Sequence, residues 1–194
     1  MRITRTRLKM LIMFPVEWVW LLAYRATSQR AKIDMDLDRF CEVHYGHAPK
    51  RYRWVYLLSE LMGSAEFRSL FLFRLGRWHY LYRLFMPKRQ TLLGFDVPRE
   101  KVGGGLFIQH GYCTDLSARS IGEHCWINQR VTLGYKGNDC PTIGNNVRIG
   151  TGAVVLGNVT VGDNARIGAN AIVVHDVPAG CTVCSPAATI VKRN

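Results

Sequence analysis

The 194-residue sequence predicts a mainly β protein in which a parallel β-helix follows an α-helical region. Two observations predict this fold class. Aliphatic residues, several followed by glycine, recur every six positions in the last third of the chain, and apolar residues recur at helical spacing in the first half. A strict short period is typical of a solenoid, because each repeat buries its apolar residue only by stacking on the next repeat.

The six-residue repeat is clearest after residue 142. A small or β-branched residue follows each of the first five aliphatic members by four positions. The aliphatic members are Ile143, Ile149, Val155, Val161, Ile167 and Val173, and the small ones are Val147, Ala153, Val159, Ala165 and Ala171. Each hexad describes one flat side of a triangular coil, so three hexads make one turn. We expect the aliphatic members to form the core.

The repeat extends backward and is interrupted twice. Earlier members are Ile121, Ile127 and Leu133, and Val102 and Ile108 begin a still earlier turn. Seven residues separate Thr114 from Ile121, a slip of one residue, and ten separate Leu133 from Ile143. The second interruption predicts a loop over residues 135–141 that leaves the coil, and such loops often carry function.

Grouping the hexads in threes places corner residues above one another. Ile108, Ile127, Ile149 and Ile167 are expected to stack on one face. The residues two positions later, His110, Gln129, Thr151 and Ala169, are then expected in one column, with neighbours roughly 4.8 Å apart as in adjacent strands. Of these four, only His110 exchanges protons near neutral pH. Taken alone, it would be interpreted as an ordinary corner histidine.

The first half is predicted to be helical and basic. The apolar segment from Met10 to Tyr24 is interrupted by Pro15 and Glu17, which makes it too short to span a bilayer. Further helices are expected from Asp36 onward, over residues 54–61, and from an N-cap at Ser64 to Pro87. Residues 1–95 hold a net charge of +10, out of a formal +12 for the chain.

Three stretches resemble a known family: residues 104–111 (GGLFIQHG), 127–134 (INQRVTLG) and 140–144 (CPTIG). They are similar to the hexapeptide-repeat acyltransferase superfamily and its serine acetyltransferase-like branch, including the enzymes that O-acetylate capsular and exopolysaccharide sugars of the colanic-acid type. The resemblance covers about residues 94–194. It implies a left-handed parallel β-helix, a homotrimer, acetyl-CoA as acyl donor in the groove between subunits, and a histidine as general base.

The resemblance also implies a set of site residues. His110 is the expected general base, and Asp96 is the carboxylate expected to orient it, with a spacing one residue shorter than in the family. The cofactor is expected at Gly134, Tyr135, Thr151, Ala169, the Val174-His175 pair and a terminal base, Lys192 or Arg193. The acceptor is expected at Gln109, Gln129, Asp139 and Cys140. Transfer of an acyl group from a thioester to a hydroxyl needs such a base and donors for the oxyanion.

Departures from the family pattern bear on the acceptor. Serine acetyltransferases typically have an aspartate before the histidine and an Arg-His pair before the loop proline, whereas here these positions hold Gln109, Asp139 and Cys140. The free carboxylate of an amino acid would meet the like charge of Asp139. We therefore expect a capsular or exopolysaccharide sugar as the acceptor. L-serine, in cysteine biosynthesis, is the alternative acceptor, and an inactive hexapeptide scaffold is the non-enzyme alternative.

The expected organisation is a basic α-helical region, residues 1–93, followed by an acetyltransferase domain, residues 94–194. Six cysteines at irregular spacing fit no zinc framework, so no metal is expected. No nucleic-acid-binding motif accompanies the basic region, and nucleic acid is not expected as a partner. The protein is expected in the cytoplasm. Tryptophans with basic flanks in residues 1–30 suit peripheral contact with the inner face of a membrane, and packing within the trimer is the alternative.

Overall fold

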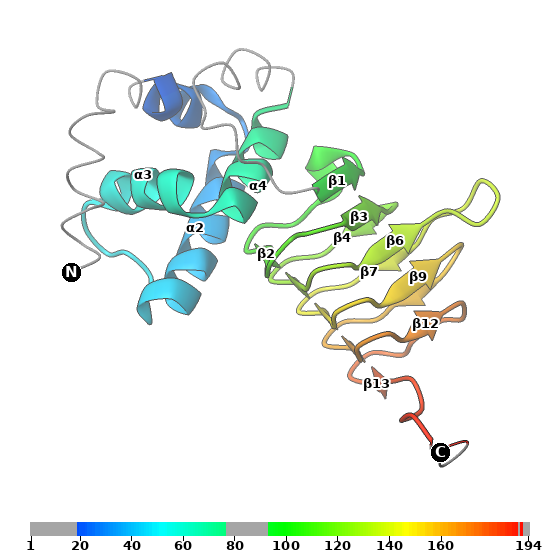
Figure 1. The fold of residues 1–194 in the computed structure, drawn as a ribbon. Helices are drawn as coiled ribbons and strands as arrows, with labels where there is room; N and C mark the ends of the chain where they lie inside the picture. The colour runs from blue at the N-terminus through cyan, green and yellow to red at the C-terminus, as the bar shows by residue number, and fades with distance from the viewer. Residues whose placement is uncertain (1–18, 77–92, 190, 192–194) are drawn as a thin grey trace.

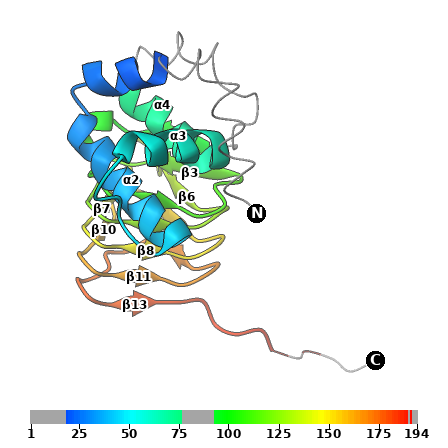
Figure 2. The ribbon, with the colours of Figure 1, turned by 90° about the vertical axis from the view of Figure 1, so that its left-hand side faces the viewer.

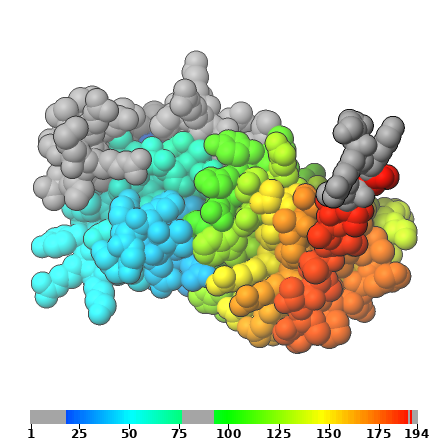
Figure 3. Space-filling model, turned by 60° about the horizontal axis from the view of Figure 1, so that its bottom comes forward, coloured from blue at the N-terminus to red at the C-terminus, as the bar shows by residue number. Residues whose placement is uncertain are grey.

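The computed structural model describes residues 19–76, 93–189 and 191. Its fold is the predicted one, a left-handed parallel β-helix preceded by helices that stack on one end of the coil (Figure 1; Figure 2). The C-terminal turns, orange and red in the space-filling view, lie at the end away from the helices (Figure 3). The core of the coil is therefore covered at its N-terminal end by the helical region.

The helical region contains α2 (Arg30–Tyr45), α3 (Arg53–Gly63) and α4 (Ala65–Leu75), and residues 19–26 are also helical. The helix predicted over residues 54–61 is confirmed by α3. Helix α2 begins at Arg30 rather than at the predicted Asp36. The reason is that Ile33, Leu37 and Phe40 are all buried at helical spacing, so the apolar face begins one turn earlier than predicted.

Helix α4 begins as predicted and ends earlier. The backbone N–H of Phe67 donates to Oγ of Ser64 at 3.1 Å, which is the predicted N-cap. The helix ends at Leu75, and Gly76 follows with a φ of 60°, in the left-handed region that favours glycine. The predicted continuous helix is therefore interrupted at Gly76, and the rest of its predicted range, up to Pro87, lies outside the described residues.

The coil is built from three sheets of parallel strands. The first sheet contains β1 (Leu93–Asp96), β3 (Thr114–Ser117), β6 (Thr132–Gly134), β9 (Val154–Leu156) and β12 (Ile172–Val173). The second sheet contains β4 (Ser120–Ile121), β7 (Thr142–Ile143) and β10 (Thr160–Val161). The third sheet contains β2 (Phe107–Ile108), β5 (Trp126–Ile127), β8 (Arg148–Ile149), β11 (Arg166–Ile167) and β13 (Thr182–Val183). A short 3-10 turn, η2 (Arg99–Lys101), follows β1.

The aliphatic residues of the repeat stack in the predicted register. In the third sheet Ile108 pairs with Ile127, Ile127 with Ile149, and Ile149 with Ile167. None of these four residues is more than 3% exposed. The six-residue period therefore reflects packing, as predicted: the aliphatic residues of each turn are buried against those of the next turn.

The first complete turn differs from the predicted numbering. Thr114 and Leu116 of β3 are both buried, and Leu116 is the one that pairs with Leu133 in the aliphatic column, where a larger apolar side chain gains more from burial. Eight residues therefore separate Ile108 from Leu116, and five separate Leu116 from Ile121. The predicted slip of one residue after Thr114 is wrong. The chain instead has two extra residues before β3 and one fewer after it.

A buried ion pair joins the helices to the start of the coil. Nε of Arg74, on α4, lies 3.0 Å from Oδ2 of Asp36, on α2, and neither residue is more than 1% exposed. Arg74 also donates to the carbonyl oxygens of Val102 and Gly103, at 2.8 and 2.6 Å. Asp36 in turn accepts from the backbone N–H of Leu106 at 3.0 Å. These contacts orient the segment that leads into β2.

No helix within the described part of the chain is long and apolar enough to span a membrane. Most of the segment predicted for membrane contact, residues 1–30, lies outside the described range. Within its described part, Trp20 is fully buried and Leu22 is exposed. Membrane contact and the cytoplasmic location stay predictions, as does the division into domains at residue 93.

Candidate active site

The predicted site residues in the described range fall on the two edges that border the first sheet. One edge, the His110 edge, lies where the chain passes from the third sheet to the first, at residues 109–113, 128–131, 150–153 and 168–171. The other, the Asp96 edge, lies where the chain leaves the first sheet, at residues 96–98, 117–119, 134–141, 156–159 and 174–176. The width of the first sheet separates the two edges.

His110 lies in the segment that carries the two extra residues between β2 and β3. Its φ is 58° and that of Cys113 is 51°, both in the left-handed region. His110 is also exposed. The extra residues thus place an accessible imidazole at this corner of the coil.

The predicted column of corner residues is wrong for His110. The backbone N–H of Arg130 donates to the carbonyl of Tyr112 at 2.9 Å, just as the N–H of Gly152 donates to the carbonyl of Gln129 at 3.1 Å one turn later. Tyr112 therefore stands above Gln129 in the ladder. His110 is displaced because the two extra residues loop out of the regular corner.

The two glutamines predicted to bind the acceptor differ in their surroundings. Oε1 of Gln109 accepts from the indole N–H of Trp126 at 3.2 Å. Gln129 is half-buried, and its Oε1 is a buried acceptor with no hydrogen-bond partner in the described part of the chain. An unpaired buried acceptor is unfavourable, so a donor on a bound acceptor molecule would satisfy Oε1 of Gln129.

Asp96 brings predicted residues together at the second edge. It is the last residue of β1, pairs with Ser117, and lines a hollow of ≈ 480 Å³ together with Tyr135 and Cys140. The negative charge of Asp96 is the main cause of a raised pKa at Tyr135, and hydrogen bonds with Asp96 and Cys140 raise that pKa further. The Tyr135 hydroxyl therefore keeps its proton and can donate.

The predicted loop over residues 135–141 leaves the coil as a tight hairpin. The N–H of Lys136 donates to the carbonyl of Asp139 at 2.9 Å, and the N–H of Asp139 donates back at 3.4 Å. An arginine of the preceding turn, Arg119, donates its backbone N–H to the carbonyl of Pro141 at 2.8 Å. Arg119 is not among the site residues predicted from the sequence. It lies between Leu116 and Ile121, where the spacing is five residues rather than six, so the six-residue pattern does not identify it as a corner residue.

His110 and Asp96 lie at opposite ends of β3. His110 precedes this strand, and Asp96 pairs with its last residue, Ser117. At about 3.3 Å per residue the strand alone separates them by about 10 Å. No hydrogen bond or ion pair joins the two side chains among the described residues. Within one copy of the chain, the predicted pair is therefore not formed.

The residues predicted for the cofactor are divided between the same two edges. Thr151 and Ala169 keep their predicted column, and the N–H of Asn170 donates to the carbonyl of Thr151 at 2.8 Å. Gly134, Tyr135, Val174 and His175 lie on the Asp96 edge. Lys192 and Arg193 lie outside the described residues. One copy therefore presents two halves of the predicted cofactor site, on separate edges.

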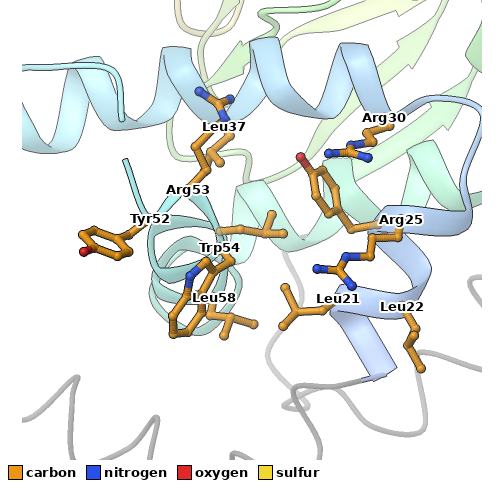
Figure 4. Close-up of a pocket in the computed structure, with 11 residues that line it drawn as sticks. Leu21, Leu22, Arg25, Arg30, Leu37, Tyr52, Arg53, Trp54 and Leu58 are labelled. Carbon is orange, nitrogen blue, oxygen red and sulfur yellow. The ribbon is translucent and has the colours of Figure 1, made fainter. Parts of the chain in front are cut away.

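A second hollow, of ≈ 540 Å³, lies within the helical region (Figure 4). Leu21 and Leu58 contribute to its apolar lining, and Arg25, Arg30 and Arg53 line it as well. None of the predicted site residues lines this hollow. The hollow beside Asp96 is therefore the one that bears on the predicted chemistry.

Comparison with known proteins agrees with the fold and the repeat. The family model described as bacterial transferase hexapeptide (six repeats) matches residues 140–175. A serine acetyltransferase of Synechococcus elongatus is 38% identical over 149 residues, which cover 71% of this chain and 61% of that protein. A serine acetyltransferase of Helicobacter pylori is 42% identical over 123 residues, which cover 60% of this chain and 72% of that protein.

The chain is also similar to an Escherichia coli protein and to a solved structure from Neisseria gonorrhoeae. An Escherichia coli protein named for colanic acid biosynthesis, the acetyltransferase WcaB, is 32% identical over 85 residues, covering 41% of this chain and 51% of that protein. The crystal structure of Neisseria gonorrhoeae serine acetyltransferase in complex with serine matches with a TM-score of 0.62 and 28% identity, covering 88% of this chain and 72% of that one.

These similarities show that the chain belongs to the hexapeptide-repeat acyltransferase superfamily. Within the superfamily it is most often similar to proteins named serine acetyltransferase. The chain spans 61% of the length of the Synechococcus relative. The resemblance seen in the sequence is thus confirmed at the level of the superfamily.

Proposed function

We propose that this chain is an acetyl-CoA-dependent O-acetyltransferase with His110 as its general base. The observation that carries the proposal is the exposed imidazole of His110, held in a two-residue insertion at a corner of the coil of an acyltransferase-family protein. A neutral imidazole takes the proton of the acceptor hydroxyl as its oxygen attacks the thioester carbonyl. The C–O bond forms, the C–S bond breaks, and the proton passes to the thiolate of CoA.

We propose further that the complete site lies between two copies in a cyclic homotrimer. If the first sheets of three copies surround a common axis, the His110 edge of each copy adjoins the Asp96 edge of its neighbour. The outward face of the first sheet is apolar in its C-terminal turns. In one copy Val154 and Leu156 are half-buried there, and Ile172 and Val174 are exposed. Such a face gains from burial against other copies.

The trimer would bring together the groups that one copy holds apart. Asp96 of one copy would orient His110 of the next, and the groove between them would hold acetyl-CoA. Thr151 and Ala169 would line one wall of this groove, and the residues of the Asp96 edge would line the other. Backbone N–H groups near Gly134 and Tyr135 would act as donors to the oxyanion.

Two acceptors have specific support. The relatives favour L-serine, since most of the similarities above are to proteins named serine acetyltransferase. The polysaccharide sugar expected from the sequence has weaker support from relatives, through the shorter match to WcaB. The sugar is favoured by Gln109, Asp139 and Cys140, which replace the charged acceptor pattern of the family. L-serine is therefore the first acceptor to test, and sugars are the second.

The proposal is tested by the rate of thiol release from acetyl-CoA with L-serine and with capsular or exopolysaccharide repeat units. Replacing a general base lowers the rate typically by about 10²- to 10⁴-fold, so His110→Ala should lose transfer to that extent. His47→Ala is the matched control, because His47 is an exposed histidine of the helical region. A wild-type protein that transfers acetyl to no hydroxyl acceptor would instead support the scaffold alternative.

A further inference from the structure

The hollow at the Asp96 edge contains charged groups that the proposed transfer reaction does not use. It is lined by Phe95, Asp96, Val97, Pro98, Lys101, Ala118, Arg119, Tyr135 and Cys140. Two cations, Arg119 and Lys101, thus face the same space as the carboxylate of Asp96 and the hydroxyl of Tyr135. A site for a wholly neutral acceptor has no need of these cations.

Arg119 is held in position by the backbone and only lightly engaged through its side chain. Its N–H donates to the carbonyl of Pro141 at 2.8 Å, which ties the residue to the base of the hairpin loop. Its guanidinium lies 3.4 Å from Oδ1 of Asp139, and these two side chains are 53% and 55% exposed. A single contact at such exposure is a weak ion pair.

The guanidinium therefore keeps most of its hydrogen-bonding capacity. It has five N–H donors in a planar fork, and the contact with Asp139 uses one of its nitrogens. A carboxylate fits two parallel N–H donors of such a fork. Asp139 also no longer acts as an isolated like charge, because Arg119 offsets its charge. Asp139 therefore repels a carboxylate-bearing acceptor less than the sequence suggests.

We propose that Arg119 binds a carboxylate on the acceptor, so that the acetylated molecule is a hydroxy acid, either a free amino acid or an acidic sugar. This inference rests on the proposed acetyltransferase function. In this arrangement the family's loop arginine is replaced by an arginine of the preceding turn. Lys101 adds positive charge to the same hollow, while Asp96 stays available to His110 of the neighbouring copy.

The test compares acceptors that differ only at the carboxylate. L-serine is paired with L-serinamide, and D-glucuronic acid is paired with D-glucuronamide, each with wild type, Arg119→Gln and Arg119→Lys. We expect Arg119→Gln to lower kcat/KM for the preferred carboxylated acceptor about tenfold to a hundredfold, mainly through KM, because a charged hydrogen bond of the bound acceptor is lost. Arg119→Lys should recover part of this loss, since it restores charge without the fork.

The neutral member of each pair supplies the internal control. Its kcat/KM should be unchanged by Arg119→Gln, as should that of the carboxylated acceptor in Arg166→Gln, an exposed arginine of β11 on the third sheet. Circular dichroism would verify that the variants are folded. If Arg119→Gln does not fold, the comparison is made with Arg119→Lys instead.

The outcomes separate this inference from the proposed function. If Arg119→Gln lowers kcat/KM for L-serine but not for L-serinamide, the carboxylate belongs to an amino acid. If the same difference appears in the glucuronic acid pair, it belongs to an acidic sugar. Transfer to carboxylated and neutral members at equal rates, or an equal loss for both in Arg119→Gln, would overturn the role of Arg119 while leaving the acetyltransferase intact. Absence of thiol release with every acceptor would overturn the proposed function itself, and the inference with it.

Discussion

At the scale of single residues, the buried pair of Arg74 and Asp36 joins the helices to the first turn of the coil. Arg74 satisfies the Asp36 carboxylate and the carbonyls of Val102 and Gly103, and both Arg74 and Asp36 are buried. Burial raises the pKa of Asp36, and the charge of Arg74 opposes that rise. The contact with Arg74 thus offsets part of the unfavourable burial of the Asp36 carboxylate.

Arg74→Met should destabilise the protein strongly. Removing one partner of a buried pair leaves the other charge uncompensated, and we expect a loss of about 3–5 kcal/mol in the free energy of unfolding. Urea denaturation followed by circular dichroism would measure it. Arg51→Met, at an exposed arginine, is the control and should leave the unfolding midpoint near that of wild type. Equal midpoints for the two variants would show that the buried pair does not seat the helices.

At the scale of elements, the spacing between turns of the coil depends on residues without side chains. A Cβ built on Gly122 would lie 2.5 Å from both the carbonyl carbon and the oxygen of Gly144 in the next turn. Both atoms belong to the backbone, so they cannot move aside without separating the turns. A Cβ built on Gly63, at the end of α3, meets nothing within 4 Å.

The two glycines therefore make a matched pair of substitutions. Gly122→Ala should lower stability by about 1–3 kcal/mol, as overpacking of a tight core does. Gly63→Ala should be neutral or slightly stabilising, because it reduces the freedom of the unfolded chain without a clash. Thermal unfolding of both variants would check this. A Gly122→Ala protein with the melting temperature of wild type would mean that neighbouring turns can move apart without loss of stability.

At the scale of the whole molecule, the separation of His110 from Asp96 is the basis of the proposed site between neighbouring copies of a trimer. His110→Ala and Asp96→Asn should each be nearly inactive alone. When the two variants are co-expressed, random assembly should pair an intact His110 with an intact Asp96 at about a quarter of the inter-subunit sites in a cyclic trimer. Initial rates of thiol release would detect the recovered activity.

The control for this experiment is a mixture of the two purified variants under conditions that prevent subunit exchange, which should stay inactive. Failure of the co-expressed protein to recover activity would place both residues in the site of a single copy. Because β3 separates them by its length, that result would require a rearrangement of the first turn.

Much of the fold could be predicted from the sequence, because packing in a solenoid repeats with the chain. The stacking of Ile108 on Ile127 and the cap at Ser64 depend on neighbours at fixed spacing, and both are confirmed. The superfamily could also be predicted, since its motifs are continuous in sequence. Where the spacing is irregular, the prediction fails: Leu116 rather than Thr114 stacks on Leu133, and His110 leaves the corner column.

The sequence by itself determined the coil, its register over most turns and the family, because each depends on the six-residue period. Only the tertiary structure decided which residues share a hollow, since Asp96, Arg119 and Tyr135 come from three turns whose order depends on two extra residues before β3 and one fewer after it. It also decided that His110 and Asp96 stand at opposite ends of a strand. The physical reason is that the six-residue period specifies which residues stack in successive turns. Where that period is interrupted, long-range packing decides which residues lie together at an edge of the coil.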